Sequence, residues 1–189
     1  MIYFTSDWHL GEERIGINRK PNLFYRPFNS IAQQNNTIMN NLYNTFKDGD
    51  TLYHLGDVIN GNLDNAEVRL KEMVRTYPNS KFILIEGNYD EDKLDLLSDY
   101  FEIKKELNID LDGLGSCYLN HYPTKSLSGL GVSKLGITGH IHSLWKVQKN
   151  LINVGVDAWN FRLVSENDIR FCYNKMINIY DKDVFPYCI

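Results

Sequence analysis

Three short apolar runs in the first half of the chain each lead into a residue that can bind a metal ion. In chain order, the runs and these residues are 2–6 with Asp7, 51–55 with Asp57 and 81–85 with Asn88. Apolar residues recur at helical spacing over residues 30–46 and 63–77, with Ser30 as an N-cap and Pro78 as a stop. Strands that alternate with helices predict a parallel sheet, and ligands bind beyond the carboxyl ends of such strands.

The second half of the chain has a different pattern. A short acidic helix is expected at residues 91–99, and another helix is expected to begin at Ser165, where Asp168 has capping-box spacing. Residues 123–136, which contain three Gly and three Ser, predict a loop. The expected strands are 101–109, 116–120, 135–138 and 151–156. These patterns predict one α/β domain over residues 1–189, with a parallel first half and a more antiparallel second half.

Composition and charge argue against nucleic-acid-binding, membrane-binding and secreted proteins. The chain has 189 residues, a net charge of −4 and three cysteines. The acidic balance gives no bulk attraction to nucleic acid or to an anionic membrane. The cysteines are far apart and form no CxxC, and the first residues lack the features of a signal peptide. We therefore expect a cytoplasmic protein (in the host cytoplasm, if a phage encodes it) that binds neither a membrane nor extended nucleic acid.

Four of the five histidines fall within a series of short motifs that carry metal ligands. In chain order the motifs are Asp7-Trp8-His9, Gly56-Asp57, Gly87-Asn88-Tyr89-Asp90, His121 and Gly139-His140-Ile141-His142. Two carboxylates, four imidazoles and one amide are too many ligands for one tetrahedral zinc site, and they suit two divalent cations that share a carboxylate. Mixed imidazole and oxygen ligands favour manganese, with iron, zinc or nickel as alternatives, over calcium.

The order and spacing of these motifs resemble those of the calcineurin-like metallophosphoesterases, and the resemblance extends through the whole chain. Within that superfamily the sequence is most similar to small, single-domain bacterial and phage phosphoesterases. The segments that carry this closer similarity are residues 3–7, 26–28, 53–57 and 153–159. The resemblance implies a four-layer α/β fold, a mixed β-sandwich flanked by helices, with two metal ions at the rim of the sheets.

The resemblance also implies a role for each ligand. One metal ion would be held by Asp7, His9, Asp57 and His142. The other would be held by Asp57, Asn88, His121 and His140. Asp57 would bridge the two ions together with a hydroxide, and that hydroxide would attack phosphorus in line.

The sequence departs from the family pattern at two positions. Tyr89 stands where the family usually has the histidine that assists the leaving group, and Gly11-Glu12 stands where the smaller group often has Gly-His. A phenol with a reference pKa of about 10 is a poor general acid at neutral pH. This favours leaving groups that need no proton, such as a phosphate monoester released from a pyrophosphate bond. We therefore expect a phosphodiesterase or pyrophosphatase that acts on a small nucleotide-like substrate.

Other polar residues near the motifs leave alternatives open. Asp90 is either a solvated charge at a helix N-terminus or a residue that orients a ligand. Arg26 is either a surface residue or a clamp for a phosphate. Glu12 is expected to be a charge at the rim of the site. His54 is expected to be a packed, hydrogen-bonded structural residue, because its register places it off the ligand face of its strand.

Two other functions remain open from sequence. One is a catalytically weak phosphoesterase fold that serves as a protein-binding scaffold, as the retromer scaffold subunit of this superfamily does. The other is a nuclease that acts on short oligonucleotides. The scaffold is supported only by the missing general acid, since all seven presumed ligands are present.

Overall fold

The computed structural model describes residues 1–12, 26–131 and 133–178, which form two five-stranded sheets and the helices that cover them. The first sheet has the strand order β10-β1-β2-β3-β4. Strands β1 to β4 run parallel, and β10 pairs antiparallel with β1. Their bounds are β1 (Ile2–Thr5), β2 (Thr51–His54), β3 (Lys81–Ile85), β4 (Glu102–Lys104) and β10 (Val164–Ser165). The predicted parallel first half is confirmed.

The second sheet has the order β5-β6-β7-β9-β8, and its three central strands are parallel to one another. Only the edge pairs, β5 with β6 and β8 with β9, are antiparallel. The bounds are β5 (Leu107–Leu111), β6 (Gly115–Leu119), β7 (Leu135–Thr138), β8 (Val147–Gln148) and β9 (Leu151–Asn153). The prediction of a more antiparallel second half therefore holds only at the edges of this sheet.

The prediction of a loop at residues 123–136 is wrong for residues 123–129, and this explains the parallel centre of the second sheet. Residues Pro123–Gly129 form the helix α4, which is the crossover that parallel strands require between β6 and β7. The Ser- and Gly-rich composition disfavours a helix here, and tertiary packing stabilises it. Gly129 lies so close to the Tyr118 ring that an added Cβ would sit 2.5 Å from it, and hydrogen bonds join Ser126 to Tyr122 and Asn120.

Three of the remaining helices lie close to their predicted positions, namely α1 (Ile31–Thr45), α2 (Leu63–Thr76) and α5 (Glu166–Asn178). The other two are α3 (Leu94–Leu97) and the 3-10 helix η1 (Val156–Trp159). The Ser30 hydroxyl accepts a hydrogen bond from the Gln33 N–H at 3.1 Å, which confirms the predicted N-cap. At α5, the Asp168 N–H donates to Ser165 Oγ and the Ser165 N–H donates to Asp168 Oδ2, which confirms the capping box. No helix in the described ranges could span a membrane.

Three predicted elements have different bounds. The strand expected at 101–109 divides, because β4 pairs with β3 in the first sheet and β5 pairs with β6 in the second. The helix expected at 91–99 is reduced to the single turn α3, since Lys93 at its N-cap makes no side-chain cap. The strand expected at 151–156 ends at Asn153, and the 3-10 helix η1 begins at Val156.

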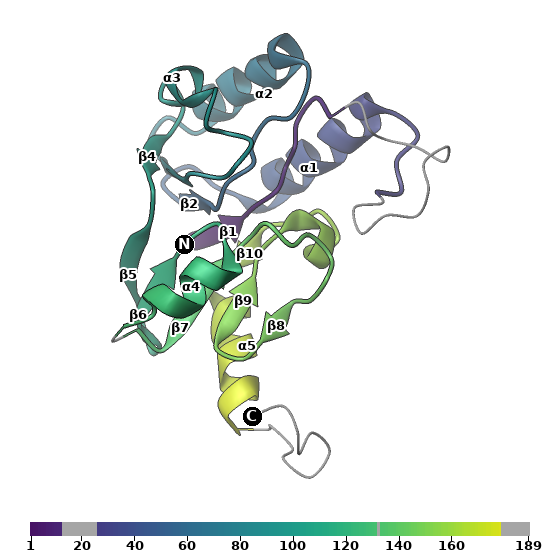
Figure 1. Ribbon diagram of the computed structural model, residues 1–189. Helices are drawn as coiled ribbons and strands as arrows, with labels where there is room; N and C mark the ends of the chain where they lie inside the picture. Colours follow the sequence, from purple (N-terminus) through teal and green to yellow (C-terminus); the bar gives the residue numbers. More distant parts are fainter. Residues whose placement is uncertain (13–25, 132, 179–189) are drawn as a thin grey trace.

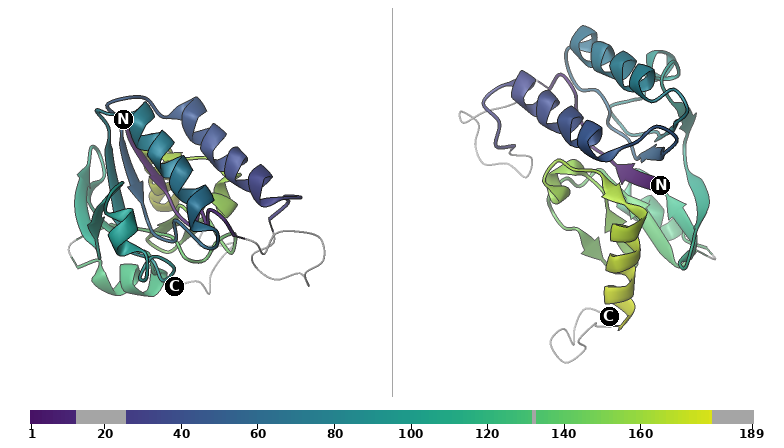
Figure 2. Two further views of the ribbon diagram at one scale, coloured as in Figure 1. Left: turned by 90° about the horizontal axis from the view of Figure 1, so that it is seen from above. Right: turned by 180° about the vertical axis from the view of Figure 1, so that it is seen from behind.

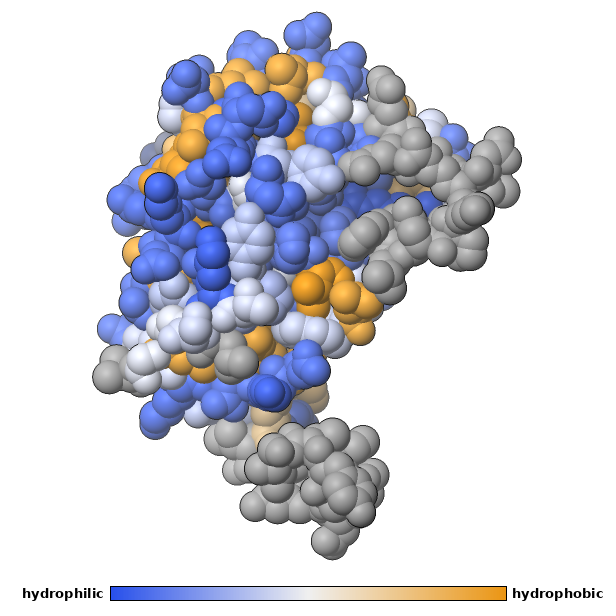
Figure 3. Space-filling model, viewed as in Figure 1, coloured by the Kyte–Doolittle hydropathy of each residue, from blue (hydrophilic) through white to orange (hydrophobic). Residues whose placement is uncertain are grey.

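The two sheets pack face to face, and helices cover their outer faces. Helices α1 and α2 lie side by side on the first sheet, and α4 lies on the second (Figure 1, Figure 2). Successive strand residues point to opposite faces, so Tyr3 packs in the core beneath the helices while Phe4 packs in the core between the sheets. These layers confirm the predicted α/β fold, a mixed β-sandwich flanked by helices. The face seen in Figure 3 is mostly hydrophilic.

His54 ends β2 and is fully buried. Its ring packs edge-on against Trp8, with ring centroids 4.6 Å apart, and Trp8 donates its indole N–H to Thr5 Oγ1 at 2.8 Å. Packing is as predicted, but the predicted hydrogen bonds are absent, because neither ring nitrogen has a partner in the described part of the chain. Burial in this apolar site lowers the pKa of His54 to about 3.

His54 is therefore expected to make the metal-free protein acid-sensitive. The folded state keeps the ring neutral down to about pH 3, whereas the unfolded chain binds a proton below about pH 6.5. Stability is thus lost as the pH falls from 6.5 towards 3, by about 2 kcal/mol at pH 5 from this residue alone. Urea unfolding of wild type and His54→Leu at pH 8 and pH 5 measures this loss. The variant should lose about 2 kcal/mol less between the two pH values, and equal losses in both proteins would contradict the assignment.

Candidate metal centre

All seven predicted ligands come from loops at one end of the two sheets. Because β1, β2 and β3 are parallel, the residues that follow them meet at the same edge. The second sheet joins this edge where Ser6 forms a parallel bridge with Gly155. The ligands and the strands they follow are Asp7 and His9 after β1, Asp57 after β2, Asn88 after β3, His121 after β6, and His140 and His142 after β7.

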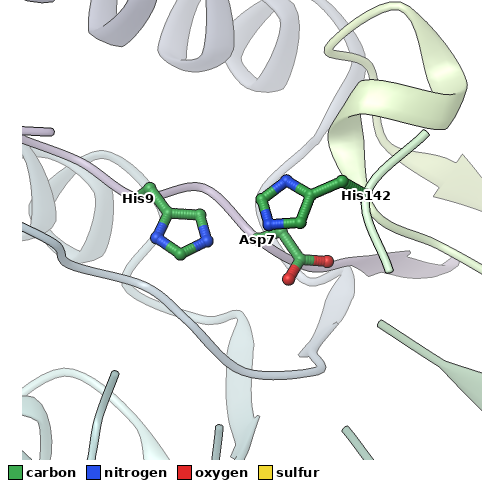
Figure 4. A group of neighbouring side chains, drawn as sticks. All are labelled: Asp7, His9 and His142. Atoms are coloured by element: carbon green, nitrogen blue, oxygen red, sulfur yellow. The ribbon is translucent and has the colours of Figure 1, made fainter. Parts of the chain in front are cut away.

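One cluster of potential metal ligands is formed by Asp7, His9 and His142, whose ligand atoms lie within 4.8 Å of one another. Figure 4 shows the carboxylate and the two imidazoles turned towards a common centre. The rings of His9 and His142 are stacked, with centroids 5.1 Å apart and planes inclined by 15°. One carboxylate and two imidazoles at this spacing can hold a divalent transition metal.

A second cluster is formed by Asp57, His121 and His140, again with ligand atoms within 4.8 Å of one another. Asn88 belongs to the same group, because its Oδ1 lies 3.1 Å from both His121 Nε2 and His140 Nδ1. The two ring nitrogens are themselves 3.2 Å apart. Four donor residues therefore converge at the ends of β2, β3, β6 and β7.

Asp57 lies between the two clusters. Its Oδ2 is 3.6 Å from His9 Nε2 in the first cluster and 3.5 Å from His121 Nε2 in the second. Burial raises the pKa of Asp57, but hydrogen bonding and charge from His121 outweigh burial and lower it to about 2. The carboxylate is therefore ionised at neutral pH, as a metal ligand must be.

The backbone is strained at five of the seven predicted ligands. The φ angles are 59° at Asp7, 48° at His9, 61° at Asp57, 73° at His140 and 50° at His142. Non-glycine residues with positive φ are uncommon, and they cluster at functional sites where the surrounding structure holds them in place. In the described ranges eight non-glycine residues have positive φ, and five of them are predicted ligands; the other three are Lys149, Asn160 and Phe161.

Glycines next to the ligands allow the loops to approach one another. A Cβ on Gly56, whose φ is +92°, would lie 2.5 Å from His121 Nδ1. A Cβ on Gly87 would collide with the Asp57 carboxylate. The Gly-Asp and Gly-Asn pairs of the motifs are thus required by close packing around the shared carboxylate.

Hydrogen bonds behind the ligands fix the orientation of two imidazoles. His121 Nδ1 donates to the Leu55 carbonyl at 2.6 Å, and His142 Nδ1 donates to Asp157 at 2.8 Å. Each bond leaves Nε2 directed at its cluster, which is the usual arrangement of metal-binding histidines. The loop that carries His142 is held by Asn153, whose Nδ2 donates to the carbonyls of His142 and Trp145, both at 2.7 Å.

Asp90 is fully buried, so it is not a solvated helix charge. Its carboxylate accepts hydrogen bonds from the N–H groups of Asp57 at 2.8 Å, Val58 at 2.9 Å and Gly87 at 2.9 Å. Burial raises its pKa, and the backbone donors act against this rise. Of the two roles left open, Asp90 has the second, because it holds the loop that carries Asp57.

Arg26 matches neither of its two predicted roles, a surface residue or a clamp for a phosphate. It is buried and forms a bidentate ion pair with Asp157, with nitrogen–oxygen distances of 2.8 Å and 2.9 Å. It also donates to the Trp8 carbonyl at 2.8 Å and to the Asp7 carbonyl. The guanidinium therefore joins the first metal-ligand loop to the carboxylate behind His142. Local sequence patterns give no sign of this pair, because 131 positions separate its members.

Tyr89 and Glu12, the two departures from the family pattern, have different surroundings. The Tyr89 ring meets His9 edge-on, with centroids 5.0 Å apart, and its N–H donates to Asp57 Oδ1 at 2.9 Å. Glu12 accepts a hydrogen bond from Asn60. Tyr89 is thus in position to contact a ligand of the first cluster, whereas Glu12 is paired with a neighbouring loop.

The residues fit divalent metal ions. Both ring nitrogens of His9 are buried and have no hydrogen-bond partner in the described part of the chain. Orphaned buried polar atoms are costly, and a metal ion would satisfy one of these nitrogens. Burial, followed by the charge of Arg26, holds the pKa of His9 well below its usual value, so the ring is neutral and able to coordinate.

Comparison with known proteins agrees with this geometry. A curated protein of Methanocaldococcus jannaschii, itself uncharacterized, is 27% identical over 87% of this chain and 86% of its own length. The crystal structure of a protein of unknown function from Aquifex aeolicus superposes with a TM-score of 0.70 at 28% identity, covering 91% of this chain and 98% of that one. The calcineurin-like phosphoesterase family profile matches residues 1–174. With two clusters of potential metal ligands at the predicted positions, the chain belongs to the calcineurin-like phosphoesterases.

Proposed function

We propose that the protein is a phosphodiesterase or pyrophosphatase that uses two divalent metal ions and acts on small nucleotide-like substrates. The observation that carries this proposal is the position of Asp57, whose Oδ2 lies about equally far from a nitrogen of each cluster, at 3.6 Å and 3.5 Å. A carboxylate in that position is suited to join two ions into one centre. When bound, a pair of divalent cations activates a water molecule and polarises a phosphoryl group.

Hydrogen bonds within the chain orient several of the predicted ligands. Asp157 and the Leu55 carbonyl hold two imidazoles so that each presents Nε2. Asp90 fixes the loop that carries Asp57. The donors combine imidazole with carboxylate and amide oxygen, so we expect manganese as the preferred metal, with iron, zinc or nickel as alternatives.

The leaving group is the step at which this chain differs from the family pattern. Tyr89 packs against His9 in the place where the family has a histidine. A phenol is poorly matched to proton transfer at neutral pH. Substrates whose leaving group departs as a stable anion, such as an aryl oxide or a nucleoside monophosphate, are therefore favoured over alkyl phosphate monoesters.

The manganese-loaded protein is expected to hydrolyse bis(p-nitrophenyl) phosphate with a kcat/KM at least about tenfold above that for p-nitrophenyl phosphate. Both substrates release the same phenolate, so the comparison does not depend on the leaving group. It tests the charge of the substrate, because a phenol, unlike a protonated imidazole, cannot balance the second negative charge of a phosphate monoester. Release of p-nitrophenolate, followed by its absorbance, measures both rates. A higher kcat/KM for the monoester would contradict the proposal.

Two variants of Tyr89 serve as controls. Tyr89→His restores an imidazole next to His9 and is expected to raise turnover of an alkyl phosphate monoester, whose leaving group needs a proton, by roughly ten- to a hundredfold, the lower part of the range for general acid catalysis. Tyr89→Phe keeps the ring and removes the hydroxyl, so it should leave the ratio of the two rates nearly unchanged. A large loss of diester turnover in Tyr89→Phe would instead assign the phenol a direct role.

The other candidate functions have less support. A protein-binding scaffold does not require potential ligands that converge within 4.8 Å in two clusters. A nuclease for short oligonucleotides performs the same reaction on a longer substrate, and it would be distinguished by cleavage of dinucleotides compared with longer single strands.

A further inference from the structure

A cavity of about 230 Å³ lies beside the second ligand cluster, and the catalytic proposal does not use it. Asn88 lines the cavity and also belongs to that cluster, so the cavity adjoins the cluster. The charged and aromatic residues of the lining are Glu86, Glu91, Lys105, Tyr122 and Lys125. The cavity thus offers both cations and carboxylates next to the predicted reaction site.

Tyr122 connects the cavity to the metal ligands. Its ring meets the ring of His140 with centroids 5.0 Å apart and that of His121 with centroids 4.9 Å apart. The Lys125 ammonium lies 4.5 Å from the centroid of the same ring. The Tyr122 ring therefore lies between the Lys125 ammonium and two imidazoles of the second cluster. A substrate with two phosphates can span this separation.

The two lysines reach the cavity from different parts of the fold. Lys105 lies in the connection that passes from β4 in the first sheet to β5 in the second, and Lys125 belongs to α4. Within the described ranges neither ammonium forms an ion pair, although Lys93 and Lys104 do. Cations that converge on a cavity without a carboxylate partner are suited to bind an anion there.

The glutamates restrict what that anion can be. Glu86 and Glu91 give the cavity as many carboxylates as ammonium groups, which disfavours a bare polyanion. Carboxylates accept hydrogen bonds from hydroxyl groups, so a phosphate attached to a sugar satisfies both kinds of side chain. The lining therefore matches a sugar phosphate such as half of a dinucleotide.

We propose that this cavity binds a second phosphate of the substrate, held by Lys105 and Lys125, so that the preferred substrates carry two phosphates and not one. This inference rests on the proposed function and names its substrate class, a nucleotide joined through a pyrophosphate bond. In the reaction, the oxygen of water bonds to one phosphorus and the bridging P–O bond breaks. The departing phosphate keeps the electron pair of that bond, and the proton of the water passes to solvent.

The test compares two substrates on the manganese-loaded protein. Diadenosine 5′,5′-diphosphate has a second phosphate for the cavity, and bis(p-nitrophenyl) phosphate has none. Lys105→Gln and Lys125→Gln are each expected to lower kcat/KM for the dinucleotide by roughly tenfold, the value of one charge-assisted hydrogen bond. Each variant should change kcat/KM for the aryl diester by less than about twofold. Lys81→Gln, at the opposite end of β3, is the matched control and should affect neither substrate.

A binding measurement separates the failure of this inference from the failure of the proposed function. Calorimetry with adenosine 5′-monophosphate needs no turnover, and each lysine variant should weaken its binding by roughly tenfold. Unchanged binding, or equal losses for both substrates, would overturn the cavity assignment and leave the phosphodiesterase proposal intact. The lysine variants could bind adenosine 5′-monophosphate more weakly while the wild type hydrolyses no diester at all. That result would overturn the proposed function and leave the cavity assignment intact.

Discussion

Asp57→Asn is expected to lower kcat by at least about a thousandfold while the protein remains folded. The amide has the size of the carboxylate and still accepts the hydrogen bond that the Tyr89 N–H donates to Oδ1. It lacks the charge that lies between His9 and His121. A neutral amide is a weak bridging ligand for two cations, so one metal ion should be lost together with the activity.

Three measurements test this result. Atomic absorption should find about two manganese ions per chain in wild type and about one in the variant, and circular dichroism should give the same spectrum for both. Asp92→Asn is the matched control, because that carboxylate is exposed and pairs only with Lys93 among the described residues. Turnover of Asp57→Asn within tenfold of wild type would be incompatible with a shared carboxylate at the centre of the site.

The metal ligands are accessible to sequence analysis because their positions follow local rules. Each of the first three motifs comes at the end of a buried strand, and parallel pairing then brings those ends together. Gly56 and Gly87 belong to the motifs because the loops approach too closely for a side chain. A reader of the sequence can therefore place Asp7, Asp57 and Asn88 at one edge without knowing any contact between them.

Other parts of the structure depend on contacts between distant segments. The composition of residues 123–136 indicates a loop, but packing of Gly129 on the Tyr118 ring stabilises the helix α4. Pairing with two different sheets divides residues 101–109 between β4 and β5. Arg26 and Asp157, separated by 131 positions, have no local signature of their pairing. Periodicity and motif spacing carry no information about contacts between distant segments. The hydrogen bonds and ion pairs that hold the predicted ligands are therefore visible only in the structure.

Arg26→Met is expected to reduce the free energy of unfolding by about 3–5 kcal/mol, because it leaves the Asp157 carboxylate buried without its cation. Both side chains are only 6% exposed. Burial raises the pKa of Asp157, but the charge of Arg26 and the hydrogen bond from His142 outweigh it and keep the pKa low. Urea unfolding of the metal-free protein at pH 7 measures the loss. Lys104→Met, which breaks the exposed pair with Glu102, should cost less than about 1 kcal/mol.

The double variant Arg26→Met, Asp157→Leu separates the stabilising role of the pair from its role in metal binding. Apolar side chains that replace a buried ion pair often restore stability, so most of the loss in Arg26→Met should be recovered. Asp157 also accepts the His142 Nδ1–H at 2.8 Å, and leucine cannot. Loss of such a partner typically weakens metal affinity by about 10–100-fold, so manganese binding should remain impaired in a protein that is again stable. Recovery of both properties would show that the Arg26–Asp157 pair only stabilises the fold, whereas recovery of stability alone assigns Asp157 to the orientation of His142.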